Sequence, residues 1–305
     1  MASPLRFIDN RLGNPEHPYD ILFNSDYSYL STMGGLSIIK TEDLLKSPAK
    51  PLTEMISDQI GGWEIHNLDN RIITSVGYKI IEIVADKVKT KLSKVDAYSI
   101  TNYSKKDQIL FLGGVDNSYL LDMKNKNRTT KMENLAGSVK RAVAVGEYHI
   151  LAEFFSENTF NIYRDSAGKD VFQIFDKNLG FNAKYGVPII LDSNAYLCTS
   201  NGLYKVLFNK DKSVDTVFLD RDFEQFKELK NNLLWITLDT ASDGYWATTE
   251  KDLIFIKKHK NKPNKVIKNP FKIVPRTDEI FLFKNFVVTL YTEGVCFYDK
   301  NKPTL

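Results

Sequence analysis

The sequence is poor in the residues that metal sites and disulfide frameworks need. Its 305 residues include four histidines and two cysteines, and no CxxC, HExxH or paired-histidine spacing occurs. Cys198 and Cys296 lie in separate β-type runs about 100 residues apart, so we expect two separate buried thiols rather than a disulfide. GxSxG, P-loop and GxGxxG motifs are also absent. We therefore predict no metal, no cofactor and no catalytic residue.

Long apolar runs and an excess of one charge are missing as well. No stretch approaches the roughly 18 apolar residues of a membrane-spanning helix. The chain has 41 basic and 38 acidic residues, and its densest basic run, at 257–262, reads as a solvated turn. Nucleic acid is therefore not an expected partner. No signal peptide is visible, but Met1-Ala2-Ser3 matches a common cloning site, so we expect part of a longer protein.

The sequence does contain a repeat that runs its whole length. In each copy a β-type run ends in a small or polar turn, and an aliphatic or aromatic residue opens the next run. The seven equivalent residues are Leu36, Tyr78, Tyr119, Phe160, Leu203, Leu253 and Val295, with gaps of 42, 41, 41, 43, 50 and 42. This period, with four strand-like runs in each, is typical of a β-propeller blade. We predict an all-β fold, a single seven-bladed β-propeller domain over residues 1–305.

The two ends of the chain support this count. Only three strands, at 279–283, 286–291 and 295–298, remain for the last blade. The unassigned strand Leu5–Asp9 can supply the fourth strand and close the ring, which removes two unpaired sheet edges. We therefore predict that Leu5–Asp9 pairs beside Val295–Tyr298.

One interval breaks the period, because the gap between Leu203 and Leu253 is 50 residues. The excess falls at 221–232, where Phe223, Phe226 and Leu229 recur every third residue among good helix formers. We predict a short helix between blades five and six. It is either a packed decoration or a contact element beside a binding site, since insertions in repeat proteins often map to the binding face.

Two segments, 191–204 and 243–253, resemble a repeat of known proteins. The pattern D-x-x-G-x-L-W-I-G-T-x-x-G-L-x-x-Y builds the two-component regulator propellers, which form the extracytoplasmic sensors of hybrid histidine kinases. Residues 19–39 are a weaker copy, and the motif tryptophan survives only as Trp246, which we expect to be buried between blades. The resemblance implies a periplasmic ligand-sensing module of a two-component signalling receptor, with carbohydrate among the small polar ligands it suggests.

Candidate binding residues follow from propeller geometry. The turns that lead into the inner strands, and those between the second and third strands, emerge on one face of a propeller. Aromatic, amide and guanidinium groups around such a face suit a small polar ligand or a peptide. The candidate ligand-binding residues are Arg141, Lys184, Tyr185, Phe223, Phe226 and Arg276.

Other functions remain open at this point. His66 lies in an inner strand with Glu64 and Asp69 near it, and it is either a structural histidine or an acid–base group. The favoured prediction is a non-catalytic sensor propeller. The alternatives are an intracellular scaffold for protein–protein interactions of the WD-repeat type and, less favoured, a propeller hydrolase of lactonase or glycosidase type. A complete natural chain would be cytoplasmic, and a sensor fragment extracytoplasmic.

Overall fold

The structure is a computed structural model of the chain. It describes residues 5–9, 18–45, 54–57, 64–68, 71–77, 79–84, 87–97, 99–104, 106–114, 116–136, 139–146, 149–154, 158–184, 186–230, 232–258, 262–263, 265–268, 279–291 and 294–302. The chain divides into two compact units, and each is described by itself. Unit 1 comprises Met1–Asp96 and Pro270–Leu305, and unit 2 comprises Ala97–Asn269.

Unit 1 contains three antiparallel sheets of four strands each. Blade 1 consists of β2 (Pro18–Phe23), β3 (Tyr27–Thr32), β4 (Gly35–Lys40) and β5 (Glu54–Ser57). Blade 2 consists of β6 (Ile65–Leu68), β7 (Arg71–Val76), β8 (Lys79–Val84) and β9 (Lys87–Asp96). Blade 7 consists of β26 (Ile280–Phe283), β27 (Phe286–Tyr291), β28 (Gly294–Asp299) and β1 (Leu5–Asp9).

Unit 2 contains four sheets of the same kind. Blade 3 consists of β10 (Ser99–Ser104), β11 (Ile109–Gly113), β12 (Asn117–Asp122) and β13 (Arg128–Ala136). Blade 4 consists of β14 (Val139–Val145), β15 (His149–Phe154), β16 (Thr159–Arg164) and β17 (Asp170–Ile174). Blade 5 consists of β18 (Val187–Leu191), β19 (Asn194–Thr199), β20 (Gly202–Phe208) and β21 (Val214–Leu219). Blade 6 consists of β22 (Leu233–Asp239), β23 (Gly244–Thr249), β24 (Asp252–Lys257) and β25 (Lys265–Lys268).

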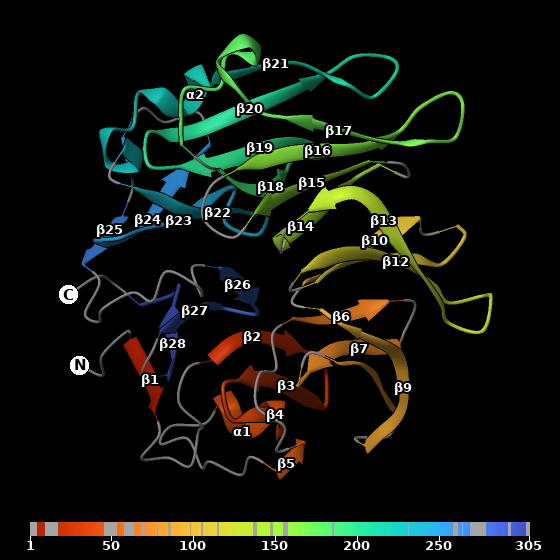
Figure 1. Ribbon diagram of the computed structural model, residues 1–305. Coiled ribbons are helices and arrows are strands. Elements are labelled where there is room, and N and C mark those ends of the chain that lie inside the picture. Colours follow the sequence, from red (N-terminus) through yellow and green to blue (C-terminus); the bar gives the residue numbers. More distant parts are fainter. Residues whose placement is uncertain are drawn as a thin grey trace. The chain divides into compact units, whose positions relative to one another are not determined.

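The first strand of the chain completes the last blade. β1 lies beside β28 in Figure 1, with Leu5 opposite Tyr298 and Asp9 opposite Gly294. Within every other blade the strands follow chain order. Seven four-stranded antiparallel sheets with this closure are the architecture of a seven-bladed β-propeller. The predicted fold class and the predicted pairing of Leu5–Asp9 are therefore confirmed.

The small and polar residues of the repeat form the turn between the second and third strands. Thr32 Oγ1 donates to the Gly35 carbonyl oxygen at 3.1 Å, and Thr199 Oγ1 donates to that of Gly202 at 2.9 Å. Gly35 and Gly202 have φ angles of 128° and 125°, which only glycine adopts without steric cost. The turn chemistry thus explains why the repeat is recognisable in the sequence.

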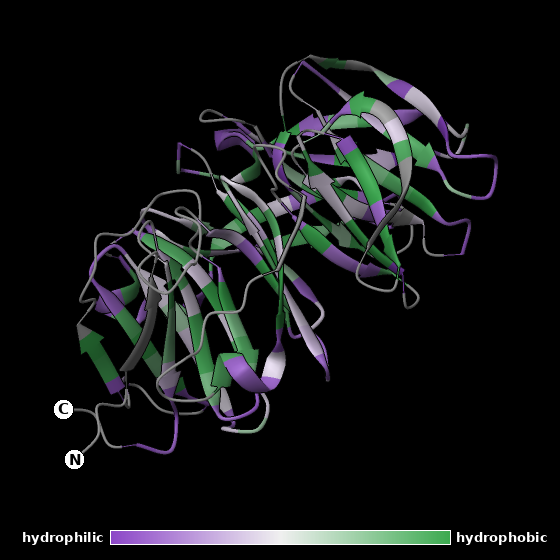
Figure 2. Cartoon of the chain, turned by 90° about the horizontal axis from the view of Figure 1, so that it is seen from below, coloured by the Kyte–Doolittle hydropathy of each residue, from purple (hydrophilic) through white to green (hydrophobic). Residues whose placement is uncertain are grey.

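The hydrophobic core lies in layers between neighbouring blades of a unit. One layer in unit 1 joins side chains of blades 1 and 2, and one in unit 2 joins blades 4 and 5. Figure 2 shows the same pattern, with hydrophobic colour concentrated on the strands and hydrophilic colour on many of the turns. The blades are therefore held face to face by burial of apolar surface.

Three buried side chains were predicted from the sequence. Trp246 is 1% exposed, and its Nε1 donates to Asp239 Oδ2 at 3.1 Å, so the predicted burial is confirmed. Cys198 and Cys296 are both buried and not joined in a disulfide, which confirms two separate thiols. Burial raises the pKa of the Cys296 thiol to about 12, so this cysteine stays an uncharged core residue at neutral pH.

The insertion between blades 5 and 6 is helical, as predicted. It forms α2 (Arg221–Glu224) and a 3₁₀ turn, η3 (Lys227–Lys230), and Asp220 caps α2 by accepting from the backbone N–H of Asp222. Phe223, Phe226 and Leu229 are buried, and the insertion contacts β20 and β23. Two other short helices, α1 (Thr41–Leu45) and η2 (Lys177–Leu179), were not predicted. Among the described residues, no helix has the length and apolar character of a membrane span.

Candidate functional site

A pocket of about 630 Å³ in unit 2 lies beside the insertion. Its walls come from the β18–β19 turn of blade 5, from α2 and the residues after it, and from β23 and β24 of blade 6. The lining residues are Leu191, Asp192, Asn194, Tyr196, Asp222, Phe223, Gln225, Phe226, Tyr245, Ile256, Lys257 and Lys258. The volume is that of a site for a small molecule.

Aromatic rings form the buried wall of this pocket. The Phe223 ring lies 5.1 Å from the Tyr245 ring and 6.5 Å from the Tyr196 ring, edge-on to both. Burial raises the pKa of the Tyr196 hydroxyl, and the neighbouring Asp220 raises it further. Both tyrosines are therefore neutral at physiological pH and offer hydroxyl groups rather than charge.

A charged contact joins the two blades beside the pocket. Asp192 occupies the β18–β19 turn with a φ of 51°. Its Oδ2 lies 3.2 Å from Lys258 Nζ and accepts from the Tyr245 hydroxyl at 3.4 Å, while the Lys258 ammonium lies 5.5 Å from the Tyr245 ring centre. The hydrogen bond with Asp192 raises the pKa of Lys258. Asp192 and Lys258 thus form a polar link from blade 5 to blade 6.

The lining charges of the pocket cancel. Asp192 and Asp222 supply two carboxylates, and Lys257 and Lys258 supply two ammonium groups. The other polar lining groups are amides and phenols. Such a wall favours an uncharged ligand with hydroxyl or amide groups over an ion, because a charged ligand would meet no net opposite charge.

The structure brings only some of the predicted site residues together. Phe223 and Phe226 line the pocket, whereas Lys184 is an exposed side chain before β18 and is not part of the lining. Arg141 lies instead on β14, where its guanidinium carbon is 4.1 Å from the ring centre of Trp235 on β22. Tyr185 and Arg276 lie outside the described residues.

Arg141 belongs to a separate cluster at the first strands of blades 4 and 6. In the β14–β15 register it pairs with Glu153, which is 2% exposed. Lys140 Nζ lies 4.0 Å from one Glu153 oxygen, and the other oxygen has no hydrogen-bond partner among the described residues. Burial raises the pKa of Glu153, and the charges of Lys140 and Arg141 offset only part of that effect.

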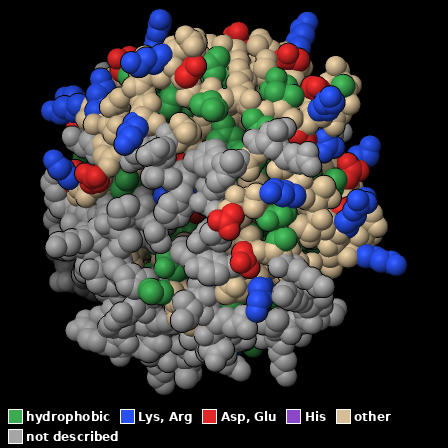
Figure 3. All heavy atoms as spheres, in the orientation of Figure 1, with side chains coloured by type: hydrophobic (Ala, Val, Ile, Leu, Met, Phe, Trp, Pro, Cys, Tyr) green, Lys and Arg blue, Asp and Glu red, His purple; other side chains and the backbone are tan. Residues whose placement is uncertain are grey.

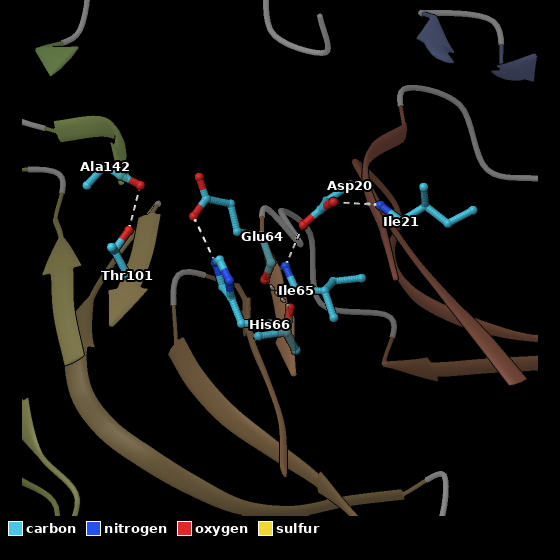
Figure 4. A network of polar contacts seen from close by, with 8 residues as sticks. Asp20, Ile21, Glu64, Ile65, His66, Thr101 and Ala142 are labelled. Atoms are coloured by element: carbon cyan, nitrogen blue, oxygen red, sulfur yellow. Dashed lines mark hydrogen bonds and ion pairs between the residues drawn. The ribbon is translucent and has the colours of Figure 1, made fainter. Parts of the chain in front are cut away.

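A second polar cluster lies in unit 1, where β2 meets β6. Asp20 of β2 is only 8% exposed, and its two carboxylate oxygens accept from the backbone N–H groups of Ile21 and Ile65, each at 2.7 Å. Figure 4 shows Asp20 between these two backbones, with the His66 ring directed at the Glu64 carboxylate. One side chain thus ties the first strand of blade 1 to that of blade 2.

Electrostatic interactions within this cluster shift the pKa values of Asp20 and His66. Burial and the charge of Glu279 raise the pKa of Asp20 to about 7. Burial would lower the pKa of His66, but Glu64, 3.4 Å from its Nε2, together with Asp20 and Glu279, raises it. The expected proximity of Glu64 to His66 is therefore present, whereas Asp69 lies outside the described residues. A histidine with a raised pKa is more often protonated at neutral pH, so it is better suited to donate a proton than to accept one.

Sequence reasoning missed most of the pocket wall. Asp192 and Tyr245 lie in the two segments that carry the repeat motif, and neither was among the candidate binding residues. Lys258 belongs to the basic run that was interpreted as a solvated turn. One signal in the sequence could have indicated them. The insertion at 221–232 lies between the two motif copies, 191–204 and 243–253, so residues of both copies could be expected beside it.

No histidine, cysteine or carboxylate cluster suited to a metal ion occurs among the described residues. On the face drawn in Figure 3, lysine, arginine and acidic side chains are interspersed over the described part of the surface. This distribution agrees with the nearly balanced composition of the chain.

No protein-family profile and no curated protein sequence matches the chain. Solved structures do match it. One is the extracellular domain of the hybrid two-component system BT4673 from B. thetaiotaomicron, with a TM-score of 0.64 and 13% identity over 94% of this chain and 38% of that one. The chain therefore spans well under half of that protein domain's length.

Two further similar structures cover nearly whole chains. The WD40 propeller domain of Doa1 has a TM-score of 0.64, 11% identity and 95% coverage of both chains. Virginiamycin B lyase from Staphylococcus aureus has a TM-score of 0.62 and 12% identity over 96% of this chain and 98% of that one. The chain shares a fold with all three. An extracellular domain of a hybrid two-component system is thus among its structural neighbours, and identities this low show the fold alone.

Proposed function

We propose that the chain is a non-catalytic, ligand-binding sensor propeller, and that it forms the extracytoplasmic part of a signalling receptor. The pocket of unit 2 is the ligand site. The ligand is a small, uncharged, polar molecule, and neutral saccharides are the first class to test because of the resemblance to two-component regulator propellers.

The observation that carries this proposal is the place of the pocket. It is lined by Phe223 and Phe226, which belong to the one insertion that breaks an otherwise regular repeat. Repeat-specific insertions in such folds commonly form binding faces. A buried aromatic wall together with exposed Asp222 and Gln225 offers both apolar contact and hydrogen bonds.

Structural likeness supports the receptor setting. The BT4673 structure is an extracellular domain of a hybrid two-component system. The fraction of that domain covered, 38%, fits a chain that is one propeller of a larger receptor. An extracytoplasmic location follows from the same proposal.

The test is a binding measurement on the purified chain. Thermal-shift assays with a panel of neutral mono- and oligosaccharides select a binder, and calorimetry then compares the parent with Asp222→Asn and Asp215→Asn. Asp222 lines the pocket, whereas Asp215 is an exposed carboxylate on β21 outside the lining. We expect weaker binding only in Asp222→Asn. Equal affinities in all three proteins would place the site elsewhere.

A protein-interaction scaffold is the second candidate, and the near-complete match to the Doa1 WD40 domain favours it. A scaffold would capture a protein partner and show no saccharide-dependent thermal shift. Cross-linking of the captured partner would map its contact surface.

A propeller enzyme would depend on His66, which is 35% exposed at its side chain and paired with Glu64. The likeness to virginiamycin B lyase is the reason to consider this candidate. Elimination or hydrolysis activity that is lost in His66→Gln would overturn the non-catalytic proposal.

A further inference from the structure

One side of the unit 2 pocket carries a hydrogen-bond acceptor and a hydrogen-bond donor side by side. Asp192 is the first residue of the two-residue turn that joins Leu191 of β18 to Asn194 of β19. Lys258 follows directly after β24. Both residues line the pocket, and Lys258 Nζ lies 3.2 Å from Asp192 Oδ2. The two neighbouring blades therefore place opposite hydrogen-bonding groups next to each other.

The contacts of Asp192 leave one of its carboxylate oxygens open. The Tyr245 hydroxyl and the Lys258 ammonium both donate to Oδ2, at 3.4 and 3.2 Å. Within the described part of the chain, no group donates to Oδ1. The side chain is 49% exposed, so Oδ1 is accessible to a bound molecule. An ionised carboxylate only accepts hydrogen bonds, so this position requires a donor from the ligand.

Lys258 supplies the complementary donor. Its backbone N–H donates to the Asp243 carbonyl oxygen at 3.0 Å, which holds the residue beside the pocket. An ammonium group has three N–H donors, and Asp192 takes one of them. The others can donate to a ligand oxygen. Because Lys258 also neutralises the charge of Asp192, the pair suits an uncharged ligand better than an ion.

Adjacent hydroxyl groups match this pair. One hydroxyl donates to Asp192 Oδ1, and its neighbour accepts from Lys258 Nζ. The Phe223 ring lies 5.1 Å from the Tyr245 ring and forms an apolar wall of the same pocket. A ring-shaped polyol has apolar C–H groups for such a wall and hydroxyl groups for the charged pair.

The turn backbone does not itself require an aspartate. Asp192 and Ser193 have φ angles of 51° and 62°. In blade 7, the turn between Phe283 and Phe286 also has two residues, and its first residue is Lys284 with a φ of 52°. The same turn position thus accepts a different side chain, so the Asp192 carboxylate is available for a role in binding.

We propose that Asp192 and Lys258 form a specificity-determining pair, which selects ligands that carry two adjacent free hydroxyl groups. Asp192 accepts from one hydroxyl and Lys258 donates to the other. The ligand class is therefore a sugar or polyol with an unsubstituted vicinal diol. This inference rests on the proposed function, because it names the chemical group that the same pocket recognises.

The test is a hydroxyl deletion scan by calorimetry. Thermal shift selects the best binder among glucose, galactose, mannose and their neutral oligomers, and calorimetry then measures this saccharide and each of its monodeoxy derivatives. The proteins are the parent, Asp192→Gly, Lys258→Met and Ser193→Gly. Glycine tolerates a positive φ, so Asp192→Gly keeps the turn. Ser193 is the matched control, because it is the exposed neighbour in the same turn and lies outside the lining.

We expect two derivatives, which lack hydroxyls on adjacent carbons, to bind the parent and Ser193→Gly about tenfold more weakly than the saccharide does. In Asp192→Gly one of these two derivatives should bind as well as the saccharide, and in Lys258→Met the other should. Melting temperatures should stay close to that of the parent.

The outcomes separate this inference from the proposed function. If the saccharide binds the parent but Asp192→Gly discriminates among the derivatives as the parent does, the specificity pair is overturned and the pocket remains the ligand site. If no saccharide binds the parent, both proposals are overturned.

Discussion

Two junctions between neighbouring four-stranded blades are built in different ways. Where blade 1 meets blade 2, one buried carboxylate, Asp20, bonds to the backbone of the next blade. Where blade 5 meets blade 6, an insertion brings Phe223 against Tyr245 and leaves a pocket beside it. The first junction is joined by a buried, hydrogen-bonded carboxylate, and the second has balanced lining charges and adds aromatic surface. The repeat therefore sets the blades, while individual departures from it set what each junction can bind.

The largest expected effect tests whether both junctions belong to one cooperative domain, as we propose for residues 1–305. Deleting residues 1–10 removes β1, which exposes the edge of β28. We expect a loss of several kcal/mol, a large part of the roughly 5–15 kcal/mol of a typical domain. Calorimetry should show one unfolding transition at a lower temperature. Two separate transitions would contradict a single domain.

The next largest effect concerns the pocket between blades 5 and 6. Phe223→Ala and Trp246→Ala each truncate a buried aromatic side chain of unit 2, and each should cost about 3–5 kcal/mol. Only Phe223 lines the pocket, so only Phe223→Ala should also weaken ligand binding. Urea denaturation and calorimetry measure the two quantities. Equal loss of affinity in both variants would mean that the effect is general destabilisation.

A smaller effect concerns the contact that Asp20 makes between blades 1 and 2. Asp20→Ala leaves the buried N–H group of Ile65 without its acceptor, which should cost about 1–3 kcal/mol at neutral pH. Urea denaturation curves measure it. Unchanged stability would contradict a stabilising role for this hydrogen bond.

The smallest effect on stability concerns the link between blades 5 and 6. Lys258→Met removes the partner of Asp192. Lys251→Met is the matched control, because Lys251 is an exposed lysine outside the pocket. We expect almost unchanged melting temperatures for Lys258→Met and Lys251→Met. Ligand affinity should fall only in Lys258→Met, because Lys258 lines the pocket and its ammonium group can donate hydrogen bonds to a polar ligand, whereas Lys251 lies outside the lining. Identical affinities would remove Lys258 from the recognition surface.

The fold was predictable because its signals are local. Thr32 with Gly35 and Thr199 with Gly202 mark turns that require those residues, and Leu5–Asp9 was the one strand left over for a blade that lacked one. The insertion was predictable from its length and from the spacing of Phe223, Phe226 and Leu229.

The sites were less predictable because they depend on contacts between distant residues. Lys258 meets Asp192 from 66 positions away, and Ile65 meets Asp20 from 45. Neither pair has a spacing that a sequence pattern encodes. Arg141 was predicted as a candidate ligand-binding residue, but it stacks on Trp235, a contact that depends on how blades 4 and 6 approach each other. Tyr185 and Arg276 remain predictions.

The most direct test of the central claim is calorimetric titration of the saccharide selected by thermal shift into the parent and into the Asp222→Asn, Lys258→Met double variant. Both side chains line the pocket, and neither belongs to the buried core. The account predicts at least about a tenfold higher dissociation constant for the double variant, equivalent to about 1.4 kcal/mol, with a melting temperature close to that of the parent. The same dissociation constant in both proteins would contradict a ligand site between blades 5 and 6.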